Sequence, residues 1–124
     1  MDIINIIGTD DIPSVILDAA NGKFEMSGRS LPEDVSAFYK PILDWMDKYS
    51  ESANPKTVFD FKLTYFNTAS SKIILDILMK LEAISNDGKE VLIKWHFPAE
   101  DEDMEEAGEE YSEIVDVPFE KVKY

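Results

Sequence analysis

The chain has 124 residues, of which 44% are hydrophobic, and it carries a formal net charge of −14 at pH 7. A chain of this length and apolar content fills one hydrophobic core, which excludes disorder of the whole chain, while its negative charge disfavours direct binding to nucleic acid. It contains no Cys and no run of about 18 apolar residues, so we predict no thiolate metal site, no secretory leader and no membrane insertion, and we expect a cytoplasmic location.

The first 30 residues predict three β-strands in succession. Asn21 and Gly22 separate the last two and favour a hairpin turn, because both residues tolerate a positive φ. The apolar residues that cluster or alternate along these strands are Ile3, Ile4, Ile6, Ile7, Val15, Leu17, Phe24 and Met26.

A helix is predicted next, since Phe38, Ile42, Trp45 and Tyr49 recur at spacings of four, three and four residues. Pro41 lies inside this pattern and lacks a backbone donor, so it predicts either a kink or the true first turn of the helix. A polar connection over residues 50–56 then leads to an apolar strand over residues 57–63.

A second helix is predicted from about residue 69 to residue 85. Its main face is expected to contain Ile73, Ile77, Leu81 and Ile84, with Ile74 and Leu78 beside it. The segment Asn86-Asp87-Gly88 is typical of a helix end. Residues 90–96 alternate in a way that predicts a strand with apolar residues on both faces, well inside a sheet.

The last third of the chain is acidic. Between residues 100 and 116 there are ten acidic residues and no Lys or Arg, so the rest of the chain carries only −4. Met104, Ala107, Tyr111 and Ile114 keep a helical spacing within this segment, which predicts an amphipathic helix with a solvated acidic face. Residues 118–124 are expected to add a last edge strand.

Alternation of strands and helices after residue 50 implies crossover connections and helices packed on a sheet. We therefore predict a single α/β domain over residues 1–124, built on a mixed sheet.

Catalytic and metal-binding patterns are scarce. His96 is the only histidine, and we predict that it is structural, at a strand end and bonded to the backbone. The acidic run does not fit a calcium loop, because Glu106 and Ser112 stand where Gly and Glu are required. We predict no catalytic residues, no metal and no cofactor. A small enzyme that uses carboxylates such as Asp60 or Asp76 stays as an alternative.

The junction between the strand at residue 57 and the helix that follows it carries several hydroxyls. Thr68 and Ser70 lie at the helix start, where unpaired N–H groups and a partial positive charge favour a phosphate. Alternatively, Asn67 or Thr68 is the helix cap, and Ser70 or Ser71 forms a local hydrogen bond. The residues alone leave both interpretations open.

The sequence of this junction resembles the phosphorylation segment of the SiaC family of bacterial biofilm-regulating phosphoproteins. The similarity covers the residues 65–72, YFNTASSK, together with VFDF before them and ILD after them. The segments PILDW at 41–45 and KWH at 94–96 extend the resemblance along most of the chain. More distantly, the strand, Asn-Thr-x-Ser and helix are similar to anti-sigma-factor antagonists of the STAS fold. Asn67 and Ser70 differ from the acidic residue and the glycine found there.

The resemblance implies a STAS-like, non-enzymatic protein of a partner-switching pathway. It implies that a serine/threonine kinase phosphorylates Thr68 and that a PP2C-type phosphatase reverses this. The unmodified form is then expected to bind and activate a diguanylate cyclase, which raises cyclic di-GMP and favours biofilm growth. The partner-binding residues carried over are Asn67, Thr68, Ser70, Ser71 and Lys72.

Two further alternatives stay open. One is an anti-sigma-factor-antagonist-like binding module. The other is an acidic decoy that mimics nucleic acid, which requires the acids of residues 100–116 to form one continuous stripe. Their concentration on one short helix is unfavourable to such a mimic, because a duplex spreads its charge along a longer track.

Overall fold

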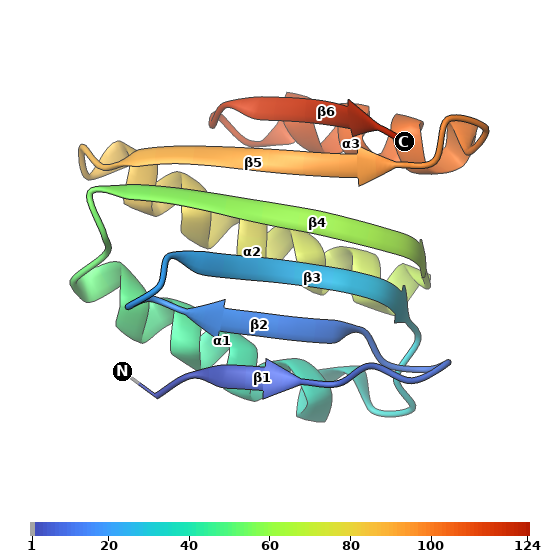
Figure 1. Cartoon of the computed structure of the whole chain (residues 1–124), viewed down its shortest axis with the longest axis horizontal. Helices are drawn as coiled ribbons and strands as arrows, with labels where there is room; N and C mark the ends of the chain where they lie inside the picture. Colours follow the sequence, from blue (N-terminus) through green and yellow to red (C-terminus); the bar gives the residue numbers. More distant parts are fainter. Residues whose placement is uncertain (1) are drawn as a thin grey trace.

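The computed structural model describes residues 2–124 as one six-stranded sheet with three helices. The strands and helices follow one another in the predicted order, and the α/β class is confirmed (Figure 1). The elements are β1 (Ile4–Ile6), β2 (Ser14–Asp18), β3 (Lys23–Ser30), α1 (Val35–Glu51), β4 (Lys56–Phe66), α2 (Thr68–Asn86), β5 (Glu90–Phe97), α3 (Glu102–Ile114) and β6 (Phe119–Lys123).

The strands lie in the sheet in the order in which they occur in the sequence, from β1 to β6. The first three are antiparallel, whereas β3, β4, β5 and β6 are parallel to one another and are joined by α1, α2 and α3. Crossovers between parallel strands are right-handed, and these all advance in the same direction, so the helices fall on the same side of the sheet. Figure 1 shows all three behind it, which leaves the other face uncovered.

The predicted hairpin is confirmed. Val15 pairs with Met26 and Leu17 with Phe24, and the chain reverses through Gly22, whose φ is +65°. A positive φ is strained for residues with a Cβ atom, which explains glycine at this position.

Helix α1 begins after Asp34, whose side chain accepts a hydrogen bond from the Ala37 N–H. Pro41 lies within the helix and not in its first turn. Its ring is exposed, whereas Ile42, Trp45 and Tyr49 of the same helix are buried. Of the two positions predicted for Pro41, the structure therefore has the one inside the helix.

Helix α2 packs a slightly different face from the one predicted. Ile77, Leu81 and Ile84 are buried as expected, but Ile74 takes the place of Ile73, which is only half-buried. The predicted helix end is confirmed, since Asp87 is the C-cap and Gly88 follows with a φ of +90°.

The hydrophobic core lies between the sheet and the helices. Aromatic rings fill its centre, where Phe59 and Phe61 stack with centroids 4.5 Å apart and Phe61 contacts Trp95 at 5.6 Å. Strand β5 has neighbours on both sides, as predicted, but its second face is open, so Leu92 and Lys94 are half-buried and not enclosed. The edge position predicted for the last strand is confirmed.

Helix α3 is rotated relative to the prediction. Met104, Gly108 and Tyr111 are buried, whereas Ala107 is half-buried and Ile114 is 60% exposed. The cause is Gly108, which lies so close to the Trp95 ring that a Cβ atom there would be 2.4 Å from Trp95 Cδ1. A glycine does not count as apolar in a periodicity analysis, so the sequence pattern centred the buried face on the wrong residues.

Candidate functional site

Three helices begin at the same edge of the sheet, where β3, β4 and β5 end (Figure 1). Each helix is capped by the side chain that precedes it, namely Asp34, Asn67 and Asp101, which accept hydrogen bonds from backbone N–H groups of their helices. The carboxyl edge of parallel strands is where α/β proteins usually bind ligands and partners. The junction singled out in the sequence lies at the middle of this edge.

Thr68 is the first residue of α2, and its side chain is exposed. The cap is Asn67, whose Oδ1 accepts a hydrogen bond from the Ser70 N–H at 2.8 Å. The hydroxyl of Thr68 therefore takes no part in capping, and it forms no hydrogen bond within residues 2–124. The structure thus separates the two roles that the sequence left open: Asn67 is the cap, and Thr68 presents a free hydroxyl.

The electrostatic surroundings of Thr68 suit a phosphate. The N–H groups of Thr68 and Ala69 belong to the first turn of a 19-residue helix and have no acceptor within the described part of the chain. Such groups, together with the helix dipole, stabilise negative charge. Lys72, one turn later, is also exposed and lies at the i+4 spacing at which side chains on a helix meet.

Ser70 does not lie on this surface. It is fully buried, and its hydroxyl donates to the Ser30 carbonyl oxygen at 3.0 Å. Ser30 Oγ in turn donates to Ser70 Oγ at 2.9 Å and lies 2.5 Å from the Tyr39 hydroxyl. Ser70 therefore joins α2 to β3 and α1, and the prediction that its side chain contacts a partner is at odds with this position.

The other residues predicted to bind a partner are accessible. Ser71 is half-buried and donates from Oγ to the Thr68 carbonyl oxygen at 2.7 Å, while Asn67 is half-buried and Lys72 exposed. Together, Asn67, Thr68, Ser71 and Lys72 form a surface of about one helical turn, and we call it the Thr68 surface.

Hollows lie on both sides of the Thr68 surface. One, of about 610 Å³, is lined by the β3–α1 loop together with Asn67 and Ala69. On the α3 side, a hollow of about 300 Å³ and one of about 220 Å³ share Phe66 and Ala107. Leu75 and Ile114 also line the smallest of these hollows and were not predicted as surface residues. Ile114 fits the apolar face predicted for its helix, so the sequence held no sign of its exposure. Leu75 lies on the side of its helix away from Ile73 and Ile77, and an apolar residue in that position was the available signal.

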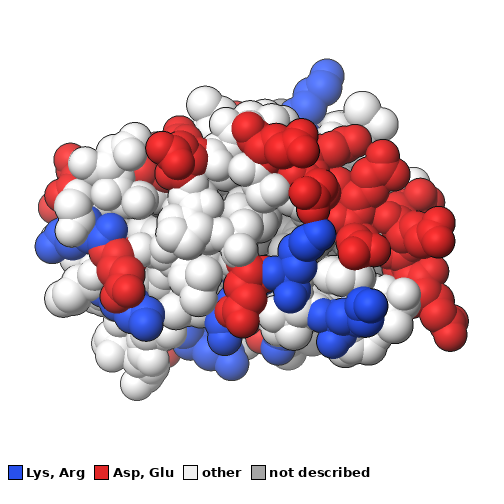
Figure 2. Space-filling view, turned by 90° about the horizontal axis from the view of Figure 1, so that it is seen from above, with Lys and Arg blue, Asp and Glu red and all other residues white. Residues whose placement is uncertain are grey.

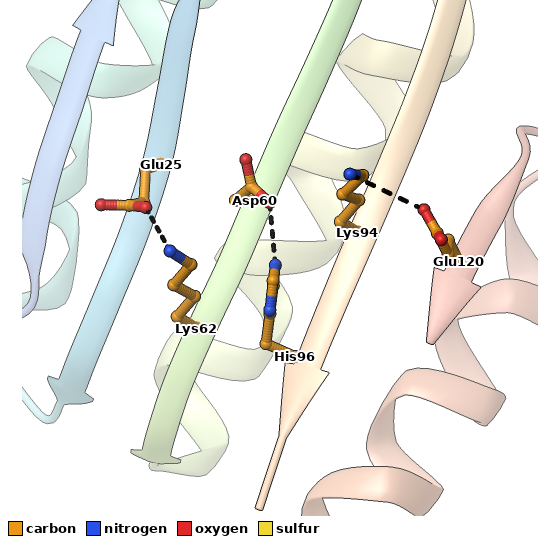
Figure 3. A network of polar contacts seen from close by, with 6 residues as sticks. All are labelled: Glu25, Asp60, Lys62, Lys94, His96 and Glu120. Carbon is orange, nitrogen blue, oxygen red and sulfur yellow. Dashed lines mark hydrogen bonds and ion pairs between the residues drawn. The ribbon is translucent and has the colours of Figure 1, made fainter. Parts of the chain in front are cut away.

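His96 lies on the open face of the sheet, where its Nε2 is 2.8 Å from Asp60 Oδ1. Figure 3 shows this pair between two others, Lys62 with Glu25 and Lys94 with Glu120. The prediction that His96 bonds to the backbone is wrong, since its partner is a carboxylate on the neighbouring strand. Asp60 and His96 line none of the hollows described above.

The other carboxylate considered for an enzyme, Asp76, is exposed on α2 and lies on the opposite layer of the molecule from Asp60. The two therefore do not meet. Among residues 2–124 there is no group of three or more His, Cys, Asp or Glu side chains placed to hold a metal ion, and no helix long and apolar enough to span a membrane.

The acidic segment forms the outer side of α3, as predicted. Figure 2 shows acidic side chains gathered at the end of the molecule where this helix begins. Those fully on the surface are Glu102, Asp103, Glu106, Glu109, Glu110 and Glu113.

Comparison with known proteins gives consistent matches along the whole chain. A family model described as "SiaC family regulatory phosphoprotein" matches residues 6–124. An uncharacterised protein of Pseudomonas aeruginosa strain UCBPP-PA14 is 31% identical over 116 residues, which are 94% of this chain and 92% of that protein.

Solved structures agree with the family match. The structure of SiaC of Pseudomonas aeruginosa is 29% identical, with a TM-score of 0.90 and full coverage of both chains. A crystal structure of the P. aeruginosa diguanylate cyclase SiaD in complex with its activator SiaC also matches. The similarity has a TM-score of 0.90 and 30% identity, and it covers 98% of this chain and 99% of the other.

Proposed function

Because the chain belongs to the SiaC family of regulatory phosphoproteins, we propose that its unmodified form binds and activates a diguanylate cyclase and that phosphorylation of Thr68 ends this activation. The observation that carries the proposal is the match, over nearly the full length of both chains, to a SiaC that was crystallised with the cyclase it activates. The exposed hydroxyl of Thr68 at the start of α2 supports the assignment of the modified residue.

The modification is a simple group transfer. A serine/threonine kinase moves the γ-phosphoryl group of ATP to Thr68 Oγ1, the hydroxyl proton is lost, and ADP leaves. A PP2C-type phosphatase hydrolyses the ester with water and releases inorganic phosphate. The chain itself acts as a binding protein and not as a catalyst. Because ATP and the GTP used by a diguanylate cyclase are cytoplasmic nucleotides, we place the pathway in the cytoplasm.

The switch acts locally. A phosphothreonine adds about −1.5 to −2 charges, a small increment on a net charge of −14, so general repulsion cannot account for release. At the start of α2 the phosphate is accommodated by free N–H groups and the helix dipole, and the fold is retained. A partner packed against Asn67, Thr68, Ser71 and Lys72 would instead have to desolvate a bulky dianion, and binding is lost.

The direct test measures synthesis of cyclic di-GMP. Diguanylate cyclases of the source organism are purified and titrated with the unmodified chain, and with the chain phosphorylated by its kinase and checked by mass spectrometry. We expect stimulation by the unmodified form alone. The matched control is Ser36, an exposed hydroxyl in the first turn of α1. Ser36→Ala should retain phosphorylation and release, whereas Thr68→Val should stimulate the cyclase and resist the kinase.

Two results would overturn the proposal. If phosphate enters the chain elsewhere and Thr68→Val is released like the wild type, Thr68 is not the switch. If no cyclase responds to the unmodified chain, the partner class is wrong, and the anti-sigma-factor-antagonist-like module becomes the better hypothesis.

A further inference from the structure

Strand β1 forms one margin of the sheet and β6 forms the other (Figure 1). An edge strand offers its backbone N–H and C=O groups to any strand that approaches, and proteins usually protect such edges with charged side chains or proline. Strand β6 has this protection, because it contains Glu120, Lys121 and Lys123 and follows Pro118. Strand β1 reads Ile-Asn-Ile and contains no charged residue. The edge at β1 therefore lacks the protection that β6 has.

The residues around β1 form a palindrome. The sequence IINII has Asn5 at its centre and two isoleucines on each side. In a two-fold interface, a residue that meets a second residue in the other copy is itself met by that second residue, so the two surfaces are identical. When two β1 strands pair antiparallel about Asn5, Ile3 lies opposite Ile7 of the other copy. Ile4 lies opposite Ile6 in the same way, so every isoleucine meets an isoleucine.

These isoleucines carry apolar surface that the single chain does not bury. Ile3 is 58% exposed and Ile7 is 86% exposed, while Ile4 and Ile6 are half-buried. Ile4 pairs with the buried Leu17 of β2, so its side chain lies on the helix side of the sheet, and those of Ile3 and Ile7 lie on the open face. Pairs of β-branched side chains directly opposite each other stabilise neighbouring strands. A second β1 strand would provide such pairs on both faces.

The backbone of this edge is oriented for the same register. The Gly8 N–H donates to Ser14 Oγ at the start of β2, at 2.8 Å. Because N–H groups point alternately to the two sides of a strand, those of Asn5 and Ile7 point away from β2. An antiparallel pair about Asn5 then joins Asn5 to its counterpart, and Ile3 to Ile7, by hydrogen bonds. The backbone and the isoleucine pairs thus select the same register.

The negative charge of the chain lies away from this edge. Asp2 is the only charged residue among residues 2–8, and in this register it lies opposite Gly8, so like charges do not face each other. Ten acidic residues lie between residues 100 and 116, in and around α3, which packs on β5 and β6. Five strand spacings, about 24 Å, separate β6 from β1. This distance exceeds the screening length of about 8 Å at physiological salt, so α3 does not repel a second copy at β1.

We propose that a second copy of this chain binds at the β1 edge, as an antiparallel β1–β1 pair with Asn5 on the two-fold axis. The two sheets then form one continuous sheet, and the unprotected edge of each copy is closed. Strand β1 lies three strand spacings, about 14 Å, from β4. The contact therefore leaves the Thr68 surface of each copy exposed, and the dimer presents two such surfaces. It requires neither phosphorylation nor a cyclase.

Sedimentation velocity over a range of protein concentrations tests the contact. We expect the chain to form a reversible dimer. Ile3→Lys combined with Ile7→Lys puts like charges opposite each other at both ends of the strand pair, so it should raise the dissociation constant about tenfold or more. Ile3→Lys combined with Ile7→Glu puts opposite charges there. It should bind about tenfold or more tightly than the double-lysine variant, because the register brings position 3 to position 7.

Ile114→Lys is the matched control. Ile114 is 60% exposed on α3, far from β1, so this variant should leave the dissociation constant nearly unchanged. A chain that stays monomeric at every concentration overturns the proposal. Equal weakening by the two double variants would contradict the register. Equal weakening by Ile114→Lys would show that association does not use the β1 edge.

A cross-linking experiment locates the two-fold axis. The chain has no Cys, so Asn5→Cys introduces a single thiol at an exposed position. On the axis this thiol meets its own counterpart, and the two Cα atoms of such a pair are about 5.5 Å apart, which a disulfide can span. We expect oxidised glutathione to link two copies of Asn5→Cys and not of Ser36→Cys, whose thiol is exposed on α1.

The outcomes of the cross-linking are decisive in both directions. Cross-linking of Asn5→Cys alone supports the proposed axis. Equal cross-linking of the two variants, or none in Asn5→Cys, overturns it, since Asn5 would then not face its counterpart. Circular dichroism confirms that each variant is folded.

Discussion

Ser70 and Ser71 are adjacent hydroxyls with different surroundings. The Ser70 hydroxyl is buried between α2, β3 and α1, whereas the Ser71 hydroxyl bonds only to the Thr68 carbonyl in its own helix. Ser70→Ala would leave the Ser30 hydroxyl without its buried acceptor, which costs about 1 to 3 kcal/mol. We expect this loss in the free energy of unfolding, measured by urea denaturation.

Ser71→Ala is the matched control, and it should change the free energy of unfolding by less than about 0.5 kcal/mol, as a surface substitution does. Equal losses in the two variants would contradict a structural role specific to Ser70. The sequence placed Thr68 at the start of a helix, and the structure has Thr68 as the first residue of α2. The sequence held no sign that Ser70 is buried, because Ser30 and Tyr39, which bury it, are 40 and 31 residues away along the chain.

Tyr39 and Tyr111 are expected to make the free energy of unfolding depend on pH in the alkaline range. Burial raises the pKa of both phenols above the usual range, although hydrogen bonds partly oppose this. Below about pH 10 both phenols are protonated in the folded and unfolded chains. Above it the unfolded chain releases protons that the folded chain retains, so the free energy of unfolding falls as pH rises.

We expect urea denaturation between about pH 9 and 11.5 to show this fall, and Tyr111→Phe to make it shallower. Thr64→Ala, an exposed substitution on β4 that removes no ionisable group, provides the control and should leave the slope unchanged. If Tyr111→Phe left the fall in the free energy of unfolding with pH unchanged, the Tyr111 phenol would not be its source.

At the scale of the elements, the charge along α3 is unbalanced. Its first turn carries Glu102, Asp103 and Glu105, which suit the positive end of the helix dipole, but its last turn has no basic residue. A cation at the C-terminal end therefore adds stability, and a cation at the N-terminal end removes it, by about 0.3 to 1 kcal/mol each.

Two substitutions of equal charge change test this. We expect Glu113→Lys to raise the free energy of unfolding and Glu102→Lys to lower it, as measured by urea denaturation at low salt. Both residues are exposed. Shifts of the same sign in both variants would show that total charge, and not its position along the helix, sets the stability.

Element types and their order were predictable from spacing, since Ile77, Leu81 and Ile84, or Val91, Ile93 and Trp95, repeat with the period of their structure. The rotation of α3 was not predictable. It depends on contact between Gly108 and a tryptophan on β5, which is a property of tertiary packing. The same contact turns Ile114 away from the core and leaves it 60% exposed.

At the scale of the whole molecule, sequential strand order and right-handed crossovers leave one face of the sheet uncovered. The alternating polar residues on β4 and β5 are consistent with this, and they pair across strands, as Asp60 does with His96. The sequence predicted the crossovers and the mixed sheet. It did not predict the open face, because Leu92 in β5 suggested cover on both sides.

The net charge of −14 predicts how stability responds to salt. Like charges repel one another in the compact state, and added salt screens exposed charges that lie further apart than a few ångströms. Ion pairs such as Lys40 with Asp44 are exposed and contribute little, so their weakening by salt is the smaller effect. We expect the midpoint of thermal unfolding to rise as NaCl increases from about 10 to about 300 mM.

The position of the charge decides which variant removes this response. Replacing Glu106, Glu110 and Glu113 by Gln relieves repulsion in the segment 100–116, where ten acids lie within 17 residues, so the midpoint should start higher and rise less with salt. Replacing three dispersed acids, Asp10, Glu33 and Glu51, by their amides changes the net charge equally but should leave most of the response, because the α3 cluster is intact. If both variants reduced the rise of the midpoint with NaCl equally, repulsion would be spread over the whole surface. If the midpoint of the unaltered chain fell with NaCl, ion pairs would dominate.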